Sequence, residues 1–165
     1  MLPDVQLIES VAARLTANDI TLVTAESCTG GMIAAELTSL PGSSSWFEGA
    51  FVTYRLSAKE RMLGVRRETL EEHGAVSEPT AREMAEGALA RCDARIAVSV
   101  TGVAGPDGGD LLAPVGTVWF GWAVQTPDPR CVQASRHELS GDRADVRTQA
   151  VRIALEGVRT VLDER

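Results

Sequence analysis

The segment that decides the fold class is Thr21-Leu22-Val23-Thr24-Ala25-Glu26-Ser27-Cys28-Thr29-Gly30-Gly31. Its opening residues are β-branched or apolar, which predicts a short strand that ends near Ala25. After Gly31, residues 32–40 are rich in helix formers, so a helix is expected to follow. A strand that leads directly into a helix is the repeating unit of α/β domains. The segment therefore predicts an α/β fold in which Ser27 stands at the end of a strand.

The alternation of helices and strands continues on both sides of this segment. Apolar residues at helical spacing between Leu7 and Leu15 predict an opening helix, and further helices are expected at 58–63, 68–72, from Pro79 onward and at 143–162. Strands are expected at 51–54 and 95–100, followed by an antiparallel pair at 115–124 and 132–137. The expected architecture is a three-layer α/β/α sandwich with a mixed, mostly parallel sheet, formed by a single domain over residues 1–165.

Composition restricts the class of protein. The chain has 165 residues, 44% of them apolar and 24% charged, which is typical of one globular domain. A formal net charge of −7 argues against a nucleic-acid partner. No apolar run is long enough to span a bilayer, and the start of the chain lacks a signal-peptide pattern. Three widely spaced cysteines and two histidines give no disulfide or metal-site pattern, so we expect a cytoplasmic protein without a bound metal.

Ser27 is the first candidate for chemistry, because α/β sheets bind ligands in the crevice beyond the C-terminal ends of their strands. A helix that begins at this point would direct free backbone N–H groups and the positive end of its dipole at a bound group. Ser27 is then a candidate nucleophile whose oxyanion those N–H groups hold. The alternative is that Ser27 or Thr29 only caps the helix. Cys28 is a candidate thiolate only if one of the two histidines lies close to it.

Lys59 is the only lysine among 16 basic residues, and Tyr54 is the only tyrosine. A partly buried lysine can lose its proton near neutral pH, which arginine cannot do. A neutral lysine is the base that a nucleophilic serine needs when no histidine is available. The alternative is that compositional bias left one lysine on a solvated helix. Tyr54 is expected either to relay a proton or to pack at the edge of the core.

Two further segments are candidates for binding an anionic substrate. The loop at 101–109 follows the most apolar strand and contains Gly102 and Gly105, so its backbone can approach a ligand closely. Gly141-Asp142-Arg143 opens the last helix, with Arg147 one turn further on. A cation at a helix N-terminus opposes the dipole, which indicates a role such as holding a phosphate or a carboxylate. The alternatives are an ordinary long turn and a solvent-exposed arginine.

These motifs in combination point to a known family. From about Leu7 to about Leu155 the sequence resembles the CinA C-terminal domain family, through residues 24–31, 41–44, 74–78, 101–109, 114–116 and 140–143. The resemblance implies hydrolysis of the carboxamide of nicotinamide mononucleotide to nicotinic acid mononucleotide and ammonia, a step of NAD salvage. It also implies a serine–lysine mechanism without a metal or organic cofactor. In that mechanism Ser27 matches the nucleophile and Lys59 the general base, with Tyr54 in the same motif.

The expected substrate-binding residues come from three segments: Cys28, Thr29, Gly30, Gly31, Thr101, Gly102, Gly105, Arg143 and Arg147. The oxyanion is expected at the N–H groups of residues 28–30 or of the Thr101-Gly102 turn. One departure from the family pattern is Arg55-Leu56, where Ser-Asn is common. Two alternatives therefore stay open: a catalytically weak nucleotide-binding or partner-binding module of the same fold, and an amidase for a different amide. A homo-oligomer is expected, with a dimer favoured.

Overall fold

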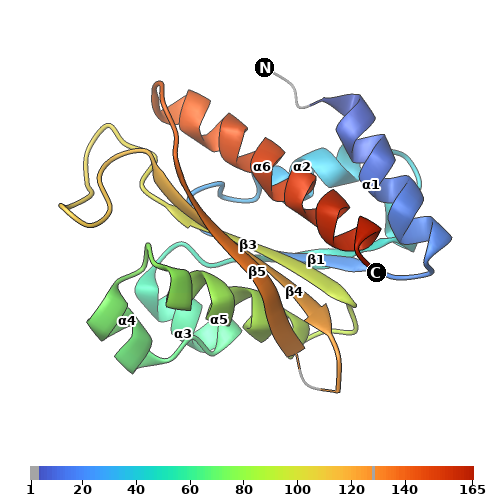
Figure 1. Cartoon of the computed structure of the whole chain (residues 1–165), viewed down its shortest axis with the longest axis horizontal. Helices are drawn as coiled ribbons and strands as arrows, with labels where there is room; N and C mark the ends of the chain where they lie inside the picture. Colours follow the sequence, from blue (N-terminus) through green and yellow to red (C-terminus); the bar gives the residue numbers. More distant parts are fainter. Residues whose placement is uncertain (1–3, 128) are drawn as a thin grey trace.

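The computed structural model describes residues 4–127 and 129–165 (Figure 1). Its helices are α1 (Val5–Ala17), α2 (Met32–Ser39), α3 (Leu56–Leu63), α4 (Arg67–His73), α5 (Glu78–Leu89) and α6 (Arg143–Asp163), with a short 3-10 helix at Ser43–Ser45. Its strands are β1 (Leu22–Glu26), β2 (Phe47–Val52), β3 (Ile96–Gly102), β4 (Thr117–Gln125) and β5 (Pro129–Glu138). Residues 1–3, on which the expected lack of a signal peptide partly rests, lie outside the described residues. Within the described ranges no helix combines the length and apolar character that crossing a membrane requires.

The strands form one mixed sheet in the order β2-β1-β3-β4-β5. β1 pairs in parallel with both β2 and β3, whereas β3 with β4 and β4 with β5 pair antiparallel. The prediction of an α/β fold with a mixed sheet is confirmed. The expected parallel majority is wrong, because the hairpin of β4 and β5 makes half of the pairings among the described strands antiparallel.

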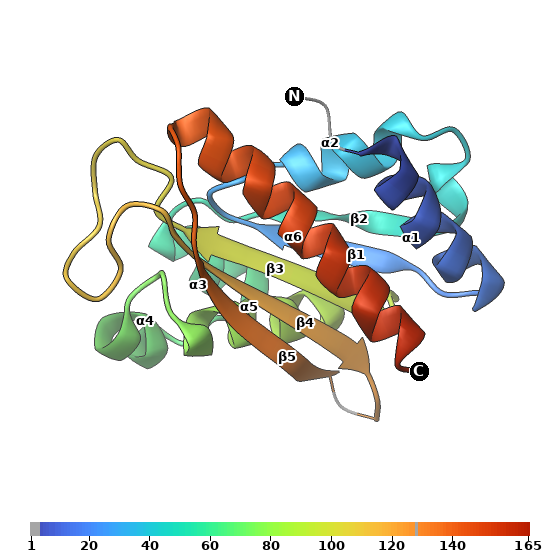
Figure 2. The same cartoon turned by 45° about the horizontal axis from the view of Figure 1, so that its top comes forward.

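Helices cover both faces of the sheet, as Figures 1 and 2 show. α1, α2 and α6 lie on one face, and α3, α4 and α5 lie on the other. Each face has its own apolar cluster, the first including Leu15, Ile33, Phe120 and Val158 and the second including Val23, Leu63, Met84 and Leu89. β1 and β3 lie between the two clusters and are buried along nearly their whole length. Their ends are therefore held firmly by packing on both sides.

β2 and α3 begin earlier in the chain than the sequence predicts. β2 is an edge strand whose side chains alternate between half-buried and exposed, and Glu48 and Gly49 interrupt its apolar pattern. For that reason the apolar signal is clear only at its end, and the prediction of 51–54 misses residues 47–50 and extends past the end of the strand. The earlier end of the strand places Thr53 and Tyr54 just beyond it, at the edge of the sheet where β1 also ends.

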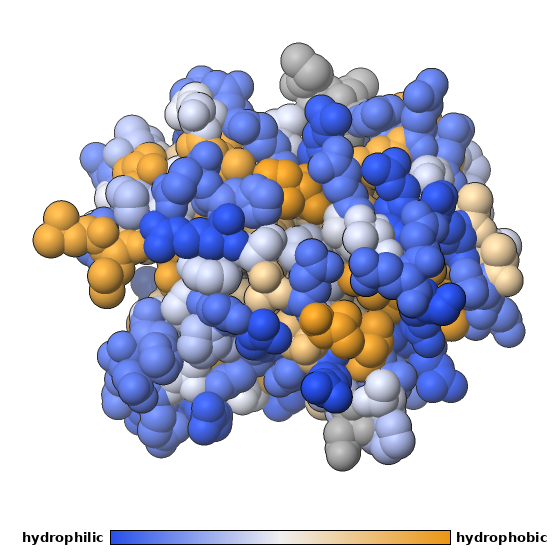
Figure 3. Space-filling model, in the orientation of Figure 1, coloured by the Kyte–Doolittle hydropathy of each residue, from blue (hydrophilic) through white to orange (hydrophobic). Residues whose placement is uncertain are grey.

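The loop between β3 and β4 projects from the body of the molecule (Figure 1). In the same orientation, Figure 3 shows an apolar tip at this place on a mostly hydrophilic surface. Leu111 and Leu112 are 102% and 81% exposed. Asp110 Oδ1 accepts hydrogen bonds from the N–H groups of Leu112 at 2.9 Å and Ala113 at 2.8 Å. These hydrogen bonds hold the turn, while the side chains of Leu111 and Leu112 stay in solvent.

Candidate active site

Three strand ends meet at one edge of the sheet. Because β1, β2 and β3 run parallel, the residues at their C-terminal ends converge. They surround a cavity of about 170 Å³. The residues that line it are Ser27, Cys28, Tyr54, Lys59, Ala75, Val76, Thr101, Gly102, Ala104 and Arg143. The structure therefore brings together residues from segments that lie far apart in the sequence.

Lys59 brings its amine to the hydroxyl of Ser27. Lys59 lies on the buried face of α3 and is 1% exposed, and its Nζ is 2.9 Å from Ser27 Oγ. Nζ also donates to the backbone carbonyls of Thr53 at 2.7 Å and Tyr54 at 3.2 Å. A neutral amine has two N–H bonds and one lone pair, so the lone pair faces Ser27 when the two carbonyls take the N–H bonds. This geometry suits a base that accepts the serine proton.

Burial also changes the proton affinity of Lys59. Desolvation of the ammonium form lowers the pKa of Lys59 from 10.5 to about 8, and the nearby Cys28 opposes this shift. With such a pKa, about one molecule in ten carries a neutral amine at pH 7. The alternative of a lysine on a solvated helix is therefore wrong, because the helix turns this side chain into the protein.

Cys28 lies beside this pair but is poorly suited to be a nucleophile. Burial raises the pKa of its thiol from 9.0 to about 11, so the thiol stays protonated at neutral pH. The residues that line the cavity include neither His73 nor His137. The hydroxyl of Ser27 is therefore the group in this cavity that has a base within reach.

The start of α2 differs from the prediction. The Glu26 carboxylate accepts hydrogen bonds at 3.0, 3.2 and 2.9 Å from the backbone N–H groups of Gly31, Ile33 and Ala34. The expectation that this helix directs free N–H groups at a ligand is wrong, because a side chain of the protein itself occupies them. The N-cap residue is Gly31, with φ at 97°, so the capping alternative for Ser27 is also wrong.

Arg143, the first residue of α6, lines both the cavity at Ser27 and Lys59 and a second cavity. Its guanidinium donates to the Gly105 carbonyl at 2.8 Å and to the Tyr54 hydroxyl at 3.0 Å. The second cavity has a volume of about 470 Å³ and is lined by Ala104, Pro106, Val115, Gly141, Asp142, Arg143, Ala144 and Arg147. Arg143 and Ala104 line both cavities. A ligand that fills both would therefore pass the guanidinium of Arg143.

Arg147 holds the turn that carries the serine. It donates to the backbone carbonyls of Cys28 at 3.0 Å and Thr29 at 3.2 Å. Gly30 and Gly31 have φ values of 59° and 97°, the left-handed region that glycine adopts most readily. Thr29, Gly30, Gly31 and Gly105 line neither of the two cavities. In the described structure the two glycines shape the turn and do not line the cavity.

Sequence reasoning missed part of the cavity wall. Ala75 and Val76 line it, and the Ala75 carbonyl accepts a hydrogen bond from Thr101 Oγ1 at 2.7 Å. Their only signal in the sequence was the motif at 74–78, which gave no chemical reason for a site. Arg55 and Leu56, which depart from the family pattern, are exposed and do not line the cavity.

Comparison with known proteins shows similarity over nearly the whole chain. The CinA C-terminal domain matches residues 4–162. The protein named nicotinamide-nucleotide amidohydrolase PncC of Escherichia coli K12 is 53% identical over 152 residues, which cover 92% of this chain and 90% of that protein. A crystal structure of a CinA superfamily protein from Klebsiella pneumoniae superposes with a TM-score of 0.91 at 38% identity, covering 98% of both chains. A crystal structure of the competence/damage-inducible protein CihA from Agrobacterium tumefaciens superposes with a TM-score of 0.86 at 40% identity, covering 99% of this chain and 98% of that one. The chain belongs to the CinA C-terminal domain family.

Proposed function

We propose that this protein hydrolyses the carboxamide of nicotinamide mononucleotide, giving nicotinic acid mononucleotide and ammonia, as a step of NAD salvage. The observation that carries the proposal is the buried contact of 2.9 Å between Lys59 Nζ and Ser27 Oγ. A serine hydroxyl beside a desolvated amine is suited to attack on an amide carbonyl. The relative in Escherichia coli that is named for this activity, at 53% identity, supports the choice of substrate.

In the proposed mechanism, neutral Lys59 takes the proton of Ser27 as Oγ attacks the carboxamide carbon. The tetrahedral intermediate then breaks its C–N bond, and the ammonium of Lys59 returns the proton to the departing nitrogen, which leaves as ammonia. A water molecule next attacks the acyl-enzyme ester, with Lys59 again as the base, and releases the acid and the Ser27 hydroxyl. No metal or organic cofactor takes part in these steps.

The oxyanion of the tetrahedral intermediate needs backbone donors near Ser27. Of the expected donors, the N–H of Gly30 already donates to the Ser27 carbonyl at 3.0 Å. The N–H groups of Gly31, Ile33 and Ala34 donate to Glu26, and that of Met32 donates to the Thr29 carbonyl. Cys28 and Gly102 line the cavity, so the proposed donors are the N–H of Cys28 or that of Gly102 at the end of β3.

The two adjoining cavities match the two ends of the proposed substrate. The nicotinamide ring enters the smaller cavity, of about 170 Å³, with its carboxamide at Ser27. The ribose phosphate extends into the larger one, of about 470 Å³, where Arg143 and Arg147 provide positive charge. The positive pyridinium ring withdraws electrons from the carboxamide and disfavours the ammonium form of Lys59 in the complex. The homo-oligomer and the cytoplasmic location expected from the sequence stay predictions.

The direct test is an ammonia-release assay with nicotinamide mononucleotide, run beside a thermal-shift measurement with the same ligand. We expect both ammonia release and a rise in melting temperature. Stabilisation without ammonia would favour a binding module of the same fold. If both signals are absent and another amide in a small substrate panel releases ammonia, the protein is an amidase with a different substrate.

The pH dependence of the reaction follows from the state of Lys59. Only the neutral amine accepts a proton, so kcat/KM is expected to rise with pH and to level off above the pKa of about 8, well below the ~10.4 of free lysine. The rising limb of kcat is expected at still lower pH, because kcat reports the complex that contains the pyridinium. Rates measured between pH 6 and 10 test this. A limb centred near the value of free lysine would contradict the role of Lys59.

A further inference from the structure

Glu26 is a fully buried acidic residue next to the serine. Its side chain is 0% exposed, and among the described residues no salt bridge involves it. Besides the three N–H groups of α2, its carboxylate accepts from Thr24 Oγ1 at 3.1 Å and from Thr29 Oγ1 at 2.7 Å. An ionised carboxylate only accepts hydrogen bonds, which matches this set of five donors. The negative charge is therefore held by hydrogen bonds and by the helix dipole.

These hydrogen bonds fix the turn that follows Ser27. Thr29 lies two residues after the serine and Gly31 four residues after it, and both donate to the same oxygen of Glu26. Glu26 precedes Ser27 directly, so the carboxylate ties the two ends of the turn to each other. The Ser27 N–H donates to the Val100 carbonyl at 2.9 Å. The serine is thereby held on its N-terminal side by β3 and on its C-terminal side by Glu26.

The main chain of Glu26 reaches the other member of the pair. The Thr53 N–H donates to the Glu26 carbonyl at 2.8 Å, and the Thr53 carbonyl in turn accepts from Lys59 Nζ at 2.7 Å. One residue is thus connected to Ser27 through its side chain and to Lys59 through its backbone. A substitution of Glu26 therefore removes only the side-chain contacts with the turn after Ser27, and the backbone hydrogen bond with Thr53 remains.

We propose that Glu26 is a positioning residue, whose carboxylate occupies the N-terminus of α2 and holds the Ser27 hydroxyl at hydrogen-bond distance from Lys59. This inference rests on the serine–lysine function proposed above. Glu26 does not line the catalytic cavity, so it acts through the turn and not on the substrate. Because the Glu26 carboxylate occupies the N-terminus of α2, we expect the substrate phosphate to bind in the cavity beside Arg143 and not at the start of this helix.

The test is Glu26→Gln, which keeps the size of the side chain but replaces one acceptor oxygen by a donor. At least one donor of the set then loses its acceptor. A misplacement of the serine by about 1 Å can reduce the rate ~100-fold, so kcat is expected to fall by ~10- to 100-fold. KM for nicotinamide mononucleotide is expected to stay within about two-fold, because the contacts with substrate remain. A crystal structure of the variant should place Ser27 Oγ beyond ~3.5 Å from Lys59 Nζ.

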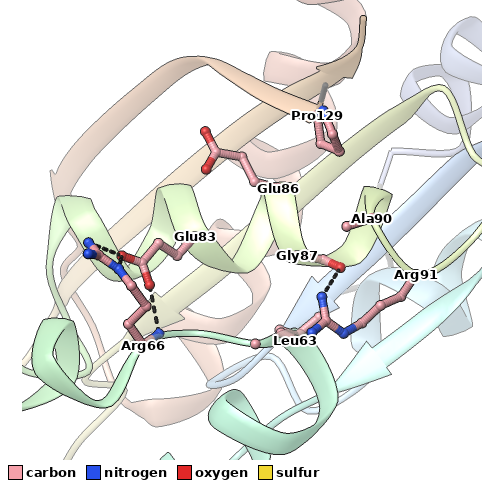
Figure 4. A pocket seen from close by; sticks show the side chains of 9 residues that line it. Leu63, Arg66, Glu83, Glu86, Gly87, Ala90, Arg91 and Pro129 are labelled. Atoms are coloured by element: carbon pink, nitrogen blue, oxygen red, sulfur yellow. Dashed lines mark hydrogen bonds and ion pairs between the residues drawn. The ribbon is translucent and has the colours of Figure 1, made fainter. Parts of the chain in front are cut away.

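Glu83→Gln is the matched control. Glu83 accepts from the Arg66 N–H at 2.8 Å and from Thr69 Oγ1 at 2.6 Å, beside a separate cavity between α3 and α5 (Figure 4). It lies outside the catalytic cavity. Glu83 also forms an ion pair with the Arg66 guanidinium at 3.0 Å. The control variant loses this charge interaction as well as an acceptor oxygen, so it is expected to melt at a lower temperature but to keep the wild-type kcat. A loss of kcat of equal size in both variants would overturn the positioning role.

Two further outcomes decide the inference. Wild-type kcat in Glu26→Gln, with the Ser27–Lys59 distance retained, would overturn it. If Glu26→Gln does not fold, Thr29→Val removes only the hydrogen bond of 2.7 Å and should lower kcat in the same direction, and an unchanged kcat there would overturn the inference. If the wild type releases no ammonia, the proposed function fails, while the crystallographic distance still decides whether Glu26 positions Ser27.

Discussion

Ser27→Ala is expected to abolish the release of ammonia from nicotinamide mononucleotide. Without Oγ no acyl-enzyme forms, and removing a serine nucleophile that works with a base costs ~10³-fold or more in kcat. The side chain is small and 7% exposed, so the fold and the binding of substrate should persist. Ammonia release and the thermal shift with substrate, measured on the same preparation, separate lost chemistry from lost binding.

Ser99→Ala is a suitable control for this variant. Ser99 is a buried serine on β3 whose Oγ donates to the Ala81 carbonyl at 2.6 Å, and it does not line the cavity at Ser27. It should keep the wild-type rate at temperatures below its melting transition. Turnover retained in Ser27→Ala would exclude Ser27 as the nucleophile.

Lys59→Arg is expected to reduce kcat by ~10²- to 10⁴-fold, the usual contribution of general acid–base catalysis. Arginine keeps the positive charge but does not lose its proton in a protein. The rising limb of the pH profile should disappear together with the rate, because the group that titrates is gone. Rates at pH 7 and pH 9 for the wild type and the variant measure both effects.

Arginine is larger than lysine, and this site is 1% exposed, so a second variant is needed. Lys59→Met keeps a chain of similar length without any base, and it should lose activity to a similar extent. Circular dichroism of both variants reports whether the fold is retained. A rate close to that of the wild type in either folded variant would exclude Lys59 as the base.

The sequence singles out Ser27 and Lys59 as candidates, and the structure places them in contact. Ser27 follows a clear strand, and Lys59 stands out because arginine replaces lysine everywhere else in the chain. Ser27 Oγ and Lys59 Nζ lie 2.9 Å apart, although the residues are 32 positions apart in the sequence. The parallel pairing of β1 with β2 and the burial of one face of α3 bring them together. Glu26 escaped prediction because its role depends on donors from both the strand and the helix. A buried acceptor and a solvated carboxylate look the same in a sequence.

The elements of the sheet are also predicted well where the sequence pattern is local, and poorly where their position depends on distant contacts. Strong periodicity identifies α1 and α6 and the hairpin of β4 and β5. β2 is poorly predicted because an edge strand is only half-buried, which weakens its apolar pattern. The equal share of parallel and antiparallel pairings follows from the position of the hairpin beside β3, and no local pattern in the sequence specifies that neighbour.

Because Lys59 is the only lysine of the chain, its chemical modification can report on access to the cavity. No other side chain of this protein carries a primary amine, and this amine is enclosed by α3 and the ends of two strands. An amine-selective acylating reagent, such as an N-hydroxysuccinimide ester, therefore has Lys59 as its single side-chain amine target, besides the α-amine of the chain. The mass that the peptide containing Lys59 gains over time reports how often the interior of the cavity at Ser27 becomes accessible, without interference from lysines on the surface.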